Sequence, residues 1–201
     1  MKNKKHITGI ILAGGKSSRM GTDKGFVLYK NKSFVQHIIE ALQPLVDEII
    51  IVSNNPDYDV FALRHRSEND FILIKRVGDL IENAGPLAGV YTGLDYSETE
   101  NNLVISCDVP LINSETLTLL IDGIEDHTEV VQLESNGKSM PLIAMYKKQS
   151  KEVFYSLLKD GERRLRVALT HVKVKTIVLT KNQDRFTSNI NTLKNLNEIE
   201  P

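Results

Sequence analysis

The sequence has a single cysteine, no net excess of charge and no long apolar run. Cys107 is the one cysteine among 201 residues, so no internal disulfide can form, which fits a reducing compartment. The 25 lysines and arginines against 26 aspartates and glutamates give a formal net charge of -1. Without a global positive field we expect no binding to nucleic acid or to an anionic membrane. An anionic ligand therefore requires a local basic cluster.

Targeting and membrane signals are also missing. The apolar run at 7–12 follows a basic start but is too short to span a bilayer, and it leads into Gly14-Gly15-Lys16 rather than a small-residue cleavage site. The five histidines show no metal-ligand spacing. With no linker, internal repeat or low-complexity tract, the sequence predicts one cytoplasmic domain spanning residues 1–201.

Short apolar runs alternate with amphipathic stretches along the chain. This pattern predicts an α/β, Rossmann-like fold with a mostly parallel sheet and helices on both faces. The expected strands are 7–12, 48–53, 71–74, 103–107, 130–133, 142–146 and, nearer an edge, 172–179. The expected helices begin at a capping box of Ser33 and Gln36, at Gly85-Pro86, and within 117–124, 153–158 and 163–169.

Polar segments follow three of the predicted strands: the loop after Leu12, Asn54-Asn55 and Asp108. Open parallel sheets bind ligands beyond the carboxyl ends of their strands, so these segments are predicted to share one site. A carboxylate that ends an apolar strand has no packing reason to be there. We interpret Asp108 as a Mg²⁺ ligand, because hard oxygen ligands suit that ion; a turn residue before Pro110 is the alternative. Cys107 is predicted to be a small buried hydrophobe rather than a nucleophile.

The loop at 12–25 combines four glycines with Lys16, Arg19 and Lys24. Glycines let a backbone bend sharply and turn its N–H groups toward an anion, while arginine and lysine add charge for phosphate. The loop contains neither the Walker spacing nor the dinucleotide Gly-x-Gly-x-x-Gly fingerprint. A glycine-rich turn with solvated charges is the alternative, but the complete string favours a phosphate-binding loop. A second basic cluster, at Lys159, Arg163, Arg164 and Arg166, is either a solvated helix end or a site for a phosphorylated acceptor.

The string 12–25 resembles the amino-terminal motif of nucleotidyltransferases, Leu-Ala-x-Gly-x-x-x-Arg-Met-Gly followed by lysine. Gly14, Ser17 and the string Asp23-Lys24-Gly25 resemble the molybdenum cofactor guanylyltransferase branch in particular. Later matches follow in the family's order: Asp79, then 85–89, 107–110, 141–142, 161–164 and 189–192. Leu193 departs from the family pattern, which usually has proline there.

The resemblance implies a glycosyltransferase-A-like nucleotidyltransferase fold and transfer of GMP from GTP to molybdopterin or its molybdenum-loaded form, with Mg²⁺. Proteins of the same biosynthetic route are further candidate partners. The implied catalytic residues are Arg19, Lys24 and Asp108, with Asp108 as the metal ligand. The implied GTP-binding residues are Leu12, Ala13, Gly14, Gly15, Lys24, Asn54, Asp79 and Asp108. The implied acceptor-binding residues are Arg163, Arg164, Asn189 and Asn191.

Two other functions are compatible with part of this pattern. One is a cytidylyltransferase or sugar-phosphate enzyme of the same fold, against which Gly14 and Asp23-Lys24-Gly25 speak. The other is a non-catalytic nucleotide-binding scaffold, which would have little reason to keep Arg19, Lys24 and Asp108.

Overall fold

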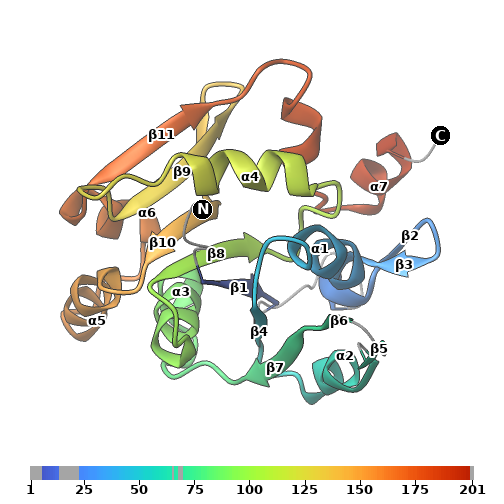
Figure 1. Cartoon of the computed structure of the whole chain (residues 1–201), viewed down its shortest axis with the longest axis horizontal. Helices are drawn as coiled ribbons and strands as arrows, with labels where there is room; N and C mark the ends of the chain where they lie inside the picture. Colours follow the sequence, from blue (N-terminus) through green and yellow to red (C-terminus); the bar gives the residue numbers. More distant parts are fainter. Residues whose placement is uncertain (1–5, 14–22, 65, 68–69, 200–201) are drawn as a thin grey trace.

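The computed structural model describes residues 6–13, 23–64, 66–67 and 70–199. Seven strands form one sheet, drawn across the middle of Figure 1. In chain order they are β1 (Ile7–Leu12), β4 (Glu48–Val52), β7 (Leu73–Val77), β8 (Asn101–Ser106), β9 (Val130–Ser135), β10 (Lys138–Lys147) and β11 (Val174–Val178). Their spatial order is β11-β9-β10-β8-β1-β4-β7, and every pairing is parallel except the two that β10 makes. The predicted α/β class with a mostly parallel sheet is confirmed.

Helices cover both faces of this sheet. They are α1 (Phe34–Leu42), α2 (Asp59–Arg64), α3 (Gly85–Tyr96), α4 (Ser114–Asp122), α5 (Ser150–Lys159), α6 (Leu165–Ala168) and α7 (Leu193–Ile199). Short 3-10 helices occur at η1 (Lys24–Phe26), η2 (Pro56–Tyr58), η3 (Leu169–His171) and η4 (Asp184–Thr187), and two small hairpins pair β2 (Leu28–Tyr29) with β3 (Lys32–Ser33) and β5 (Arg66–Ser67) with β6 (Asp70–Phe71). None of the helices in the described ranges has the length and apolar character needed to cross a membrane.

The apolar core has two main layers, one on each face of the sheet. On one face, α1 and α4 bury side chains such as Ile38, Leu42 and Leu117 against β1, β4 and β8. On the other face, α3, α5 and α6 bury side chains such as Leu94 and Phe154. Strands buried on both faces are apolar nearly throughout, which explains why β1, β4 and β8 were predictable from their composition.

Local sequence signals account for several element boundaries. The Ser33 hydroxyl accepts from the backbone N–H of Gln36, and the Gln36 side chain accepts from the backbone N–H of Ser33, which completes the predicted capping box of α1. The predicted turn between β9 and β10 is confirmed as well. Asn136 and Gly137 there have φ values of 51° and 70°, the left-handed region that a two-residue hairpin turn uses.

One predicted strand is misplaced. The strand expected at 71–74 is β7, which begins at Leu73 and ends at Val77, while Phe71 belongs to the β5–β6 hairpin. β7 lies at the edge of the sheet, where polar side chains can alternate with apolar ones. Its Arg76 donates two hydrogen bonds to the Asp59 carboxylate. The prediction from apolar runs missed the second half of β7, because Lys75 and Arg76 interrupt the apolar run.

The carboxyl ends of six strands meet at one edge of the sheet, because every strand except β10 points the same way. Backbone hydrogen bonds continue past the strand ends: Ala13 N donates to Val52 O at 3.0 Å and Cys107 N donates to Leu12 O at 3.0 Å. β10 runs in the opposite direction, so its first residues lie at this same edge.

Candidate functional site

A cleft of about 620 Å³ opens at this edge between the ends of β1 and β4 and the start of α3. We call it the α3 cleft. Four of the residues predicted to bind a nucleotide line it, namely Leu12, Ala13, Asn54 and Asp79. The predicted loop residues Gly14, Gly15, Lys16, Ser17 and Arg19 lie outside the described residues. Apolar and small side chains from α3, including Pro86 and Gly89, complete the wall.

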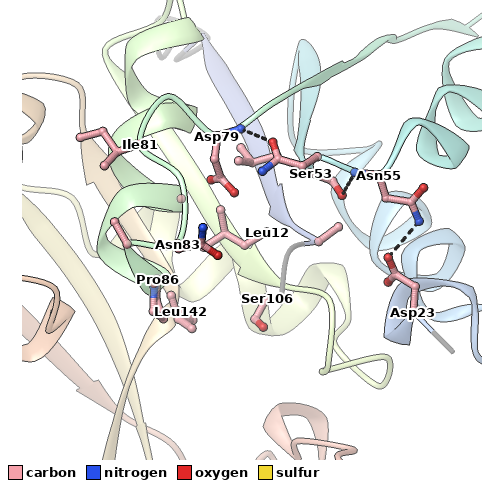
Figure 2. A pocket seen from close by; sticks show the side chains of 16 residues that line it. Leu12, Asp23, Ser53, Asn55, Asp79, Ile81, Asn83, Pro86, Ser106 and Leu142 are labelled. Atoms are coloured by element: carbon pink, nitrogen blue, oxygen red, sulfur yellow. Dashed lines mark hydrogen bonds between the residues drawn. The ribbon is translucent and has the colours of Figure 1, made fainter. Parts of the chain in front are cut away.

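Asn54 and Asp79 lie on neighbouring strand-end loops and contact each other. The Asn54 side-chain oxygen accepts a hydrogen bond of 2.8 Å from the backbone N–H of Asp79. Gly78 fits this arrangement because a Cβ there would lie 3.0 Å from the same oxygen. The Asp79 carboxylate points into the cleft (Figure 2), and burial together with the nearby charge of Glu82 raises its pKa above the usual range. A desolvated carboxylate in a cleft wall is suited to accept hydrogen bonds from a ligand.

A second cleft of about 600 Å³ adjoins the first, and we call it the β10 cleft. Its lining includes four more predicted residues, Asp108, Arg163, Arg164 and Asn189. Two cations to which the sequence analysis gave no individual role, Lys138 and Arg166, also line it, and its floor is apolar around Met140 and Pro141. Pro86, Ser106 and Leu142 line both clefts, so the two share a wall.

Arg163 and Arg164, the two arginines of the β10 cleft that were predicted to bind the acceptor, already have partners. Arg163 donates to the carbonyl of Leu158 at 2.7 Å, which satisfies an acceptor near the carboxyl end of α5. Arg164 donates to both carboxylate oxygens of Glu162, at 2.9 and 2.7 Å. These bonds, with the backbone N–H groups of Arg164 and Arg163, lower the pKa of Glu162 to about 2. An anion entering the cleft would have to compete with Glu162 for Arg164.

Lys24, Asp108 and Asn191 come from three distant motifs and meet beside the β10 cleft. The Lys24 ammonium donates a hydrogen bond to the Asn191 side-chain oxygen and lies 3.9 Å from a carboxylate oxygen of Asp108. The backbone N–H of Ile190 donates to the Asp108 carbonyl at 2.8 Å, which fixes the 189–191 segment to the end of β8. The Asp108 side chain is 17% exposed and the Lys24 side chain 22%, so both remain accessible to a ligand.

The donor set at Asp108 fits a magnesium ion that is shared with phosphate. In the described part of the chain, no group of three or more histidine, cysteine, aspartate or glutamate side chains could enclose a metal. Mg²⁺ in phosphate-transfer sites commonly uses one or two carboxylates and takes its other ligands from substrate and water. Asp108 is a single accessible carboxylate of that kind, at the end of a rigid central strand.

Cys107, next to Asp108, is buried, and its burial raises the pKa of the thiol to about 12. The thiolate is the reactive form of cysteine, so this side chain is inert at neutral pH. The prediction of a small buried hydrophobe is confirmed.

Asp23 has a structural role for which the sequence analysis had no signal beyond its place in the motif. It lines one end of the α3 cleft and accepts hydrogen bonds from Asn55 and Tyr58, more than thirty residues away along the chain. Figure 2 shows the bond from Asn55 at the end of the cleft opposite Asp79. Asn55 belongs to the strand-end segment Asn54-Asn55 that the sequence analysis predicted to lie at the site, and it also caps η2.

Comparison with known proteins identifies the family. The model of the MobA-like NTP transferase domain matches residues 9–175. The chain belongs to this family. A probable molybdenum cofactor guanylyltransferase from Flavobacterium johnsoniae is 34% identical over 193 residues, which cover 96% of each chain. The match therefore includes both clefts and the 189–191 segment.

Solved structures share the fold at lower sequence identity. Molybdopterin-guanine dinucleotide biosynthesis protein A from Archaeoglobus fulgidus superposes with a TM-score of 0.75 over 95% of each chain, at 21% identity. A 4-diphosphocytidyl-2C-methyl-D-erythritol synthase from Anaerococcus prevotii gives a TM-score of 0.76 at 14% identity, covering 98% of this chain and 95% of that one. At these identities the likeness concerns the fold alone.

Proposed function

We propose that the chain transfers GMP from GTP to molybdopterin or to its molybdenum-loaded form and releases pyrophosphate. The observation that carries this proposal is the pair of clefts with a common wall at Pro86, Ser106 and Leu142. Two substrates bound on either side of that wall would meet at the carboxyl end of β8. The Flavobacterium relative named as a probable molybdenum cofactor guanylyltransferase supports the choice of substrates.

The proposed reaction forms one phosphorus–oxygen bond and breaks another. An oxygen of the acceptor's terminal phosphate attacks the α-phosphorus of GTP in line with the bond to the β-phosphate, and pyrophosphate leaves with the electron pair. A phosphomonoester has a second pKa of about 6, so the attacking group is largely a dianion at neutral pH and needs no general base. The requirements are alignment of the two substrates and neutralisation of their charge.

Each part of this task has a candidate side chain. The α3 cleft would hold the nucleoside, with the Asp79 carboxylate accepting hydrogen bonds from it. Lys24 would neutralise phosphate charge beside Asp108, together with Arg19 of the loop. Asp108 would hold Mg²⁺, which when bound supplies positive charge for the phosphates. Arg164, released from Glu162, and Arg163 would bind the acceptor phosphate in the β10 cleft.

Pyrophosphate release tests this proposal. The purified protein is incubated with each of the four nucleoside triphosphates, with and without molybdopterin, in the presence of Mg²⁺. We expect release from GTP only when the acceptor is present, and loss of release when EDTA removes the metal. Preferential use of CTP would indicate a cytidylyltransferase. Release with none of the four would favour a binding scaffold and contradict the proposal.

A further inference from the structure

Asp23 is fastened to a separate segment of the chain by its carboxylate. One oxygen accepts from the backbone N–H of Gly25 at 3.1 Å and from the hydroxyl of Tyr58, and the other accepts from the Asn55 side chain at 3.1 Å. Asn55 and Tyr58 lie around η2, directly after β4, so these bonds join the residues before η1 to the rigid end of a central strand. A carboxylate with three donors has a fixed orientation.

The Tyr58 side chain is fully buried, so it cannot touch a substrate. Its ring packs against Phe26, with centroids 4.6 Å apart, and against Phe61 at 6.0 Å. Burial and the hydrogen bond to Asp23 raise its pKa, and the phenol therefore stays protonated as a donor. A buried hydroxyl needs a hydrogen-bond partner, and the Asp23 carboxylate provides one with a full charge.

Gly25 makes this contact possible. A Cβ at position 25 would lie 2.1 Å from the Tyr58 hydroxyl oxygen and 2.8 Å from two ring atoms. Only glycine therefore leaves room for the phenol to reach Asp23. The string Asp23-Lys24-Gly25 thus has a physical explanation, since its first and third residues are shaped around one buried tyrosine.

Lys24 lies between these two constrained residues. Its carbonyl accepts from the backbone N–H of Val27 at 3.1 Å, and its side chain leaves η1 toward Asn191 and Asp108. The long lysine side chain is flexible, so the direction in which it reaches depends on how firmly its backbone is held. Tyr58 acts on that backbone through Asp23.

We propose that the Tyr58 hydroxyl is a positioning group that holds Asp23 and thereby directs the Lys24 ammonium toward Asp108, which lines the β10 cleft. This inference rests on the function proposed above, because it gives Lys24 its task. It assigns a part in phosphate transfer to an aromatic side chain that is fully buried and therefore cannot contact a substrate.

A double-mutant cycle tests the inference. Tyr58→Phe removes the hydroxyl and keeps the ring, so Asp23 and the Lys24 backbone are held less firmly, and we expect kcat to fall about tenfold, which corresponds to about 1.4 kcal/mol. The dissociation constant for GTP should rise by about threefold for the same reason. In a Lys24→Ala background, where the positioned group is missing, Tyr58→Phe should change neither quantity by more than about twofold, because coupled residues are not additive.

The outcomes separate positioning from a purely structural role. Tyr155→Phe is the matched control, because it removes a hydroxyl from a half-exposed tyrosine that stacks on Tyr91, and we expect wild-type kinetics from it. If Tyr58→Phe lowers only the melting temperature, or lowers kcat by the same factor in both backgrounds, the inference is wrong. If Tyr58→Phe does not fold, as judged by circular dichroism, Asp23→Ala removes the same bond and is judged by the same cycle. If the wild type releases no pyrophosphate, the proposed function fails, while the cycle in GTP affinity still decides the positioning role.

Discussion

The ionised form of the Asp79 side chain is energetically unfavourable at its position in the structure. Its side chain is half-buried in the wall of the α3 cleft, beside Glu82, and both burial and that neighbouring charge raise its pKa. Groups with perturbed pKa values cluster at functional sites, because a site that binds a ligand is not optimised for the stability of the ligand-free protein. Cys107 shows a similar shift without any such role, since it is enclosed in the core.

The raised pKa of Asp79 gives a signed prediction for stability. Between the ordinary pKa of an aspartate and the raised one, the folded protein binds more protons than the unfolded chain, so stability falls as pH rises through that window. Asp79→Asn should therefore increase the free energy of unfolding at about pH 7 and have less effect at about pH 4, while weakening GTP binding. Urea unfolding at both pH values and a GTP titration measure this.

Asp59→Asn is the control with the opposite sign. Arg76 lowers the pKa of Asp59 by hydrogen bonding, so this carboxylate stabilises the fold above its ordinary pKa, and that contribution is lost as pH falls through the lowered one. We expect Asp59→Asn to reduce stability at neutral pH. A stability loss in Asp79→Asn as well would contradict the interpretation of Asp79.

Among the elements, strand β10 contains a pairing irregularity at the wall that the two clefts share. Its pairing with β9 shifts register between Met140 and Ala144, and the residues in between include Leu142 of the common wall. Tyr146, buried on the same strand and packed edge-on against Phe154, donates from its hydroxyl to the Pro141 carbonyl at 2.7 Å. A β-bulge changes the directions in which side chains point, and here the hydrogen bond from Tyr146 stabilises the bulge.

Tyr146→Phe should loosen this bulge while leaving the ring in place. Loss of one buried hydrogen bond predicts a stability decrease of about 1–3 kcal/mol, since the Pro141 carbonyl loses its partner. Met140 and Pro141 line only the β10 cleft, so the KM for the acceptor should rise more than the KM for GTP. Steady-state kinetics with each substrate varied in turn measures the two; an equal rise in both would contradict a local effect.

Elements and strand-end residues could be predicted where the signal is local. The capping box of α1 needs two residues three positions apart, and β1 and β8 are recognisable because both of their faces are buried. The rule that a parallel sheet brings the carboxyl ends of its strands to one edge placed the loop after Leu12, Asn54-Asn55 and Asp108 at one site, whereas Asp79 was named only by the family resemblance. No such rule predicts that Lys24 contacts Asn191, 167 positions away, or that Arg164 donates hydrogen bonds to Glu162. The first contact depends on packing of the whole chain, and the second on the local backbone conformation between α5 and α6.

In the molecule as a whole, residues near the end of the chain pack against residues near its start. A small apolar cluster joins Val27, Tyr29 and Phe34 near the β2–β3 hairpin to Ile190 and to Leu196 of α7. In Figure 1, α7 lies beside this hairpin and α1. The cluster includes residues close in sequence to the Lys24–Asn191 contact, so segments near both ends of the sequence support the same part of the site.

Ile190→Ala should therefore affect stability and turnover together. The side chain is 2% exposed, and truncation of a buried aliphatic residue costs about 2–5 kcal/mol. Because Ile190 also binds the Asp108 carbonyl through its backbone, we expect kcat to fall even at a temperature where the variant is fully folded. Leu120→Ala, on the buried face of α4, is the control that should lose similar stability and keep its kcat when folded. Equal kcat in the two folded variants would remove the cluster from the mechanism.

The reversed direction of β10 has a consequence for how such enzymes diversify. The α3 cleft is built by β1, β4 and α3, whereas the β10 cleft is built largely by the start of β10 and the segment that leads into α6. The β9–β10 turn extends from the sheet at the site edge, so residues can be inserted or exchanged there without altering the register of any parallel strand. Under the proposed assignment of the nucleotide to the α3 cleft and the acceptor to the β10 cleft, one half of the molecule can keep its nucleotide while the other exchanges its acceptor, which would let a single scaffold serve chemically unrelated products.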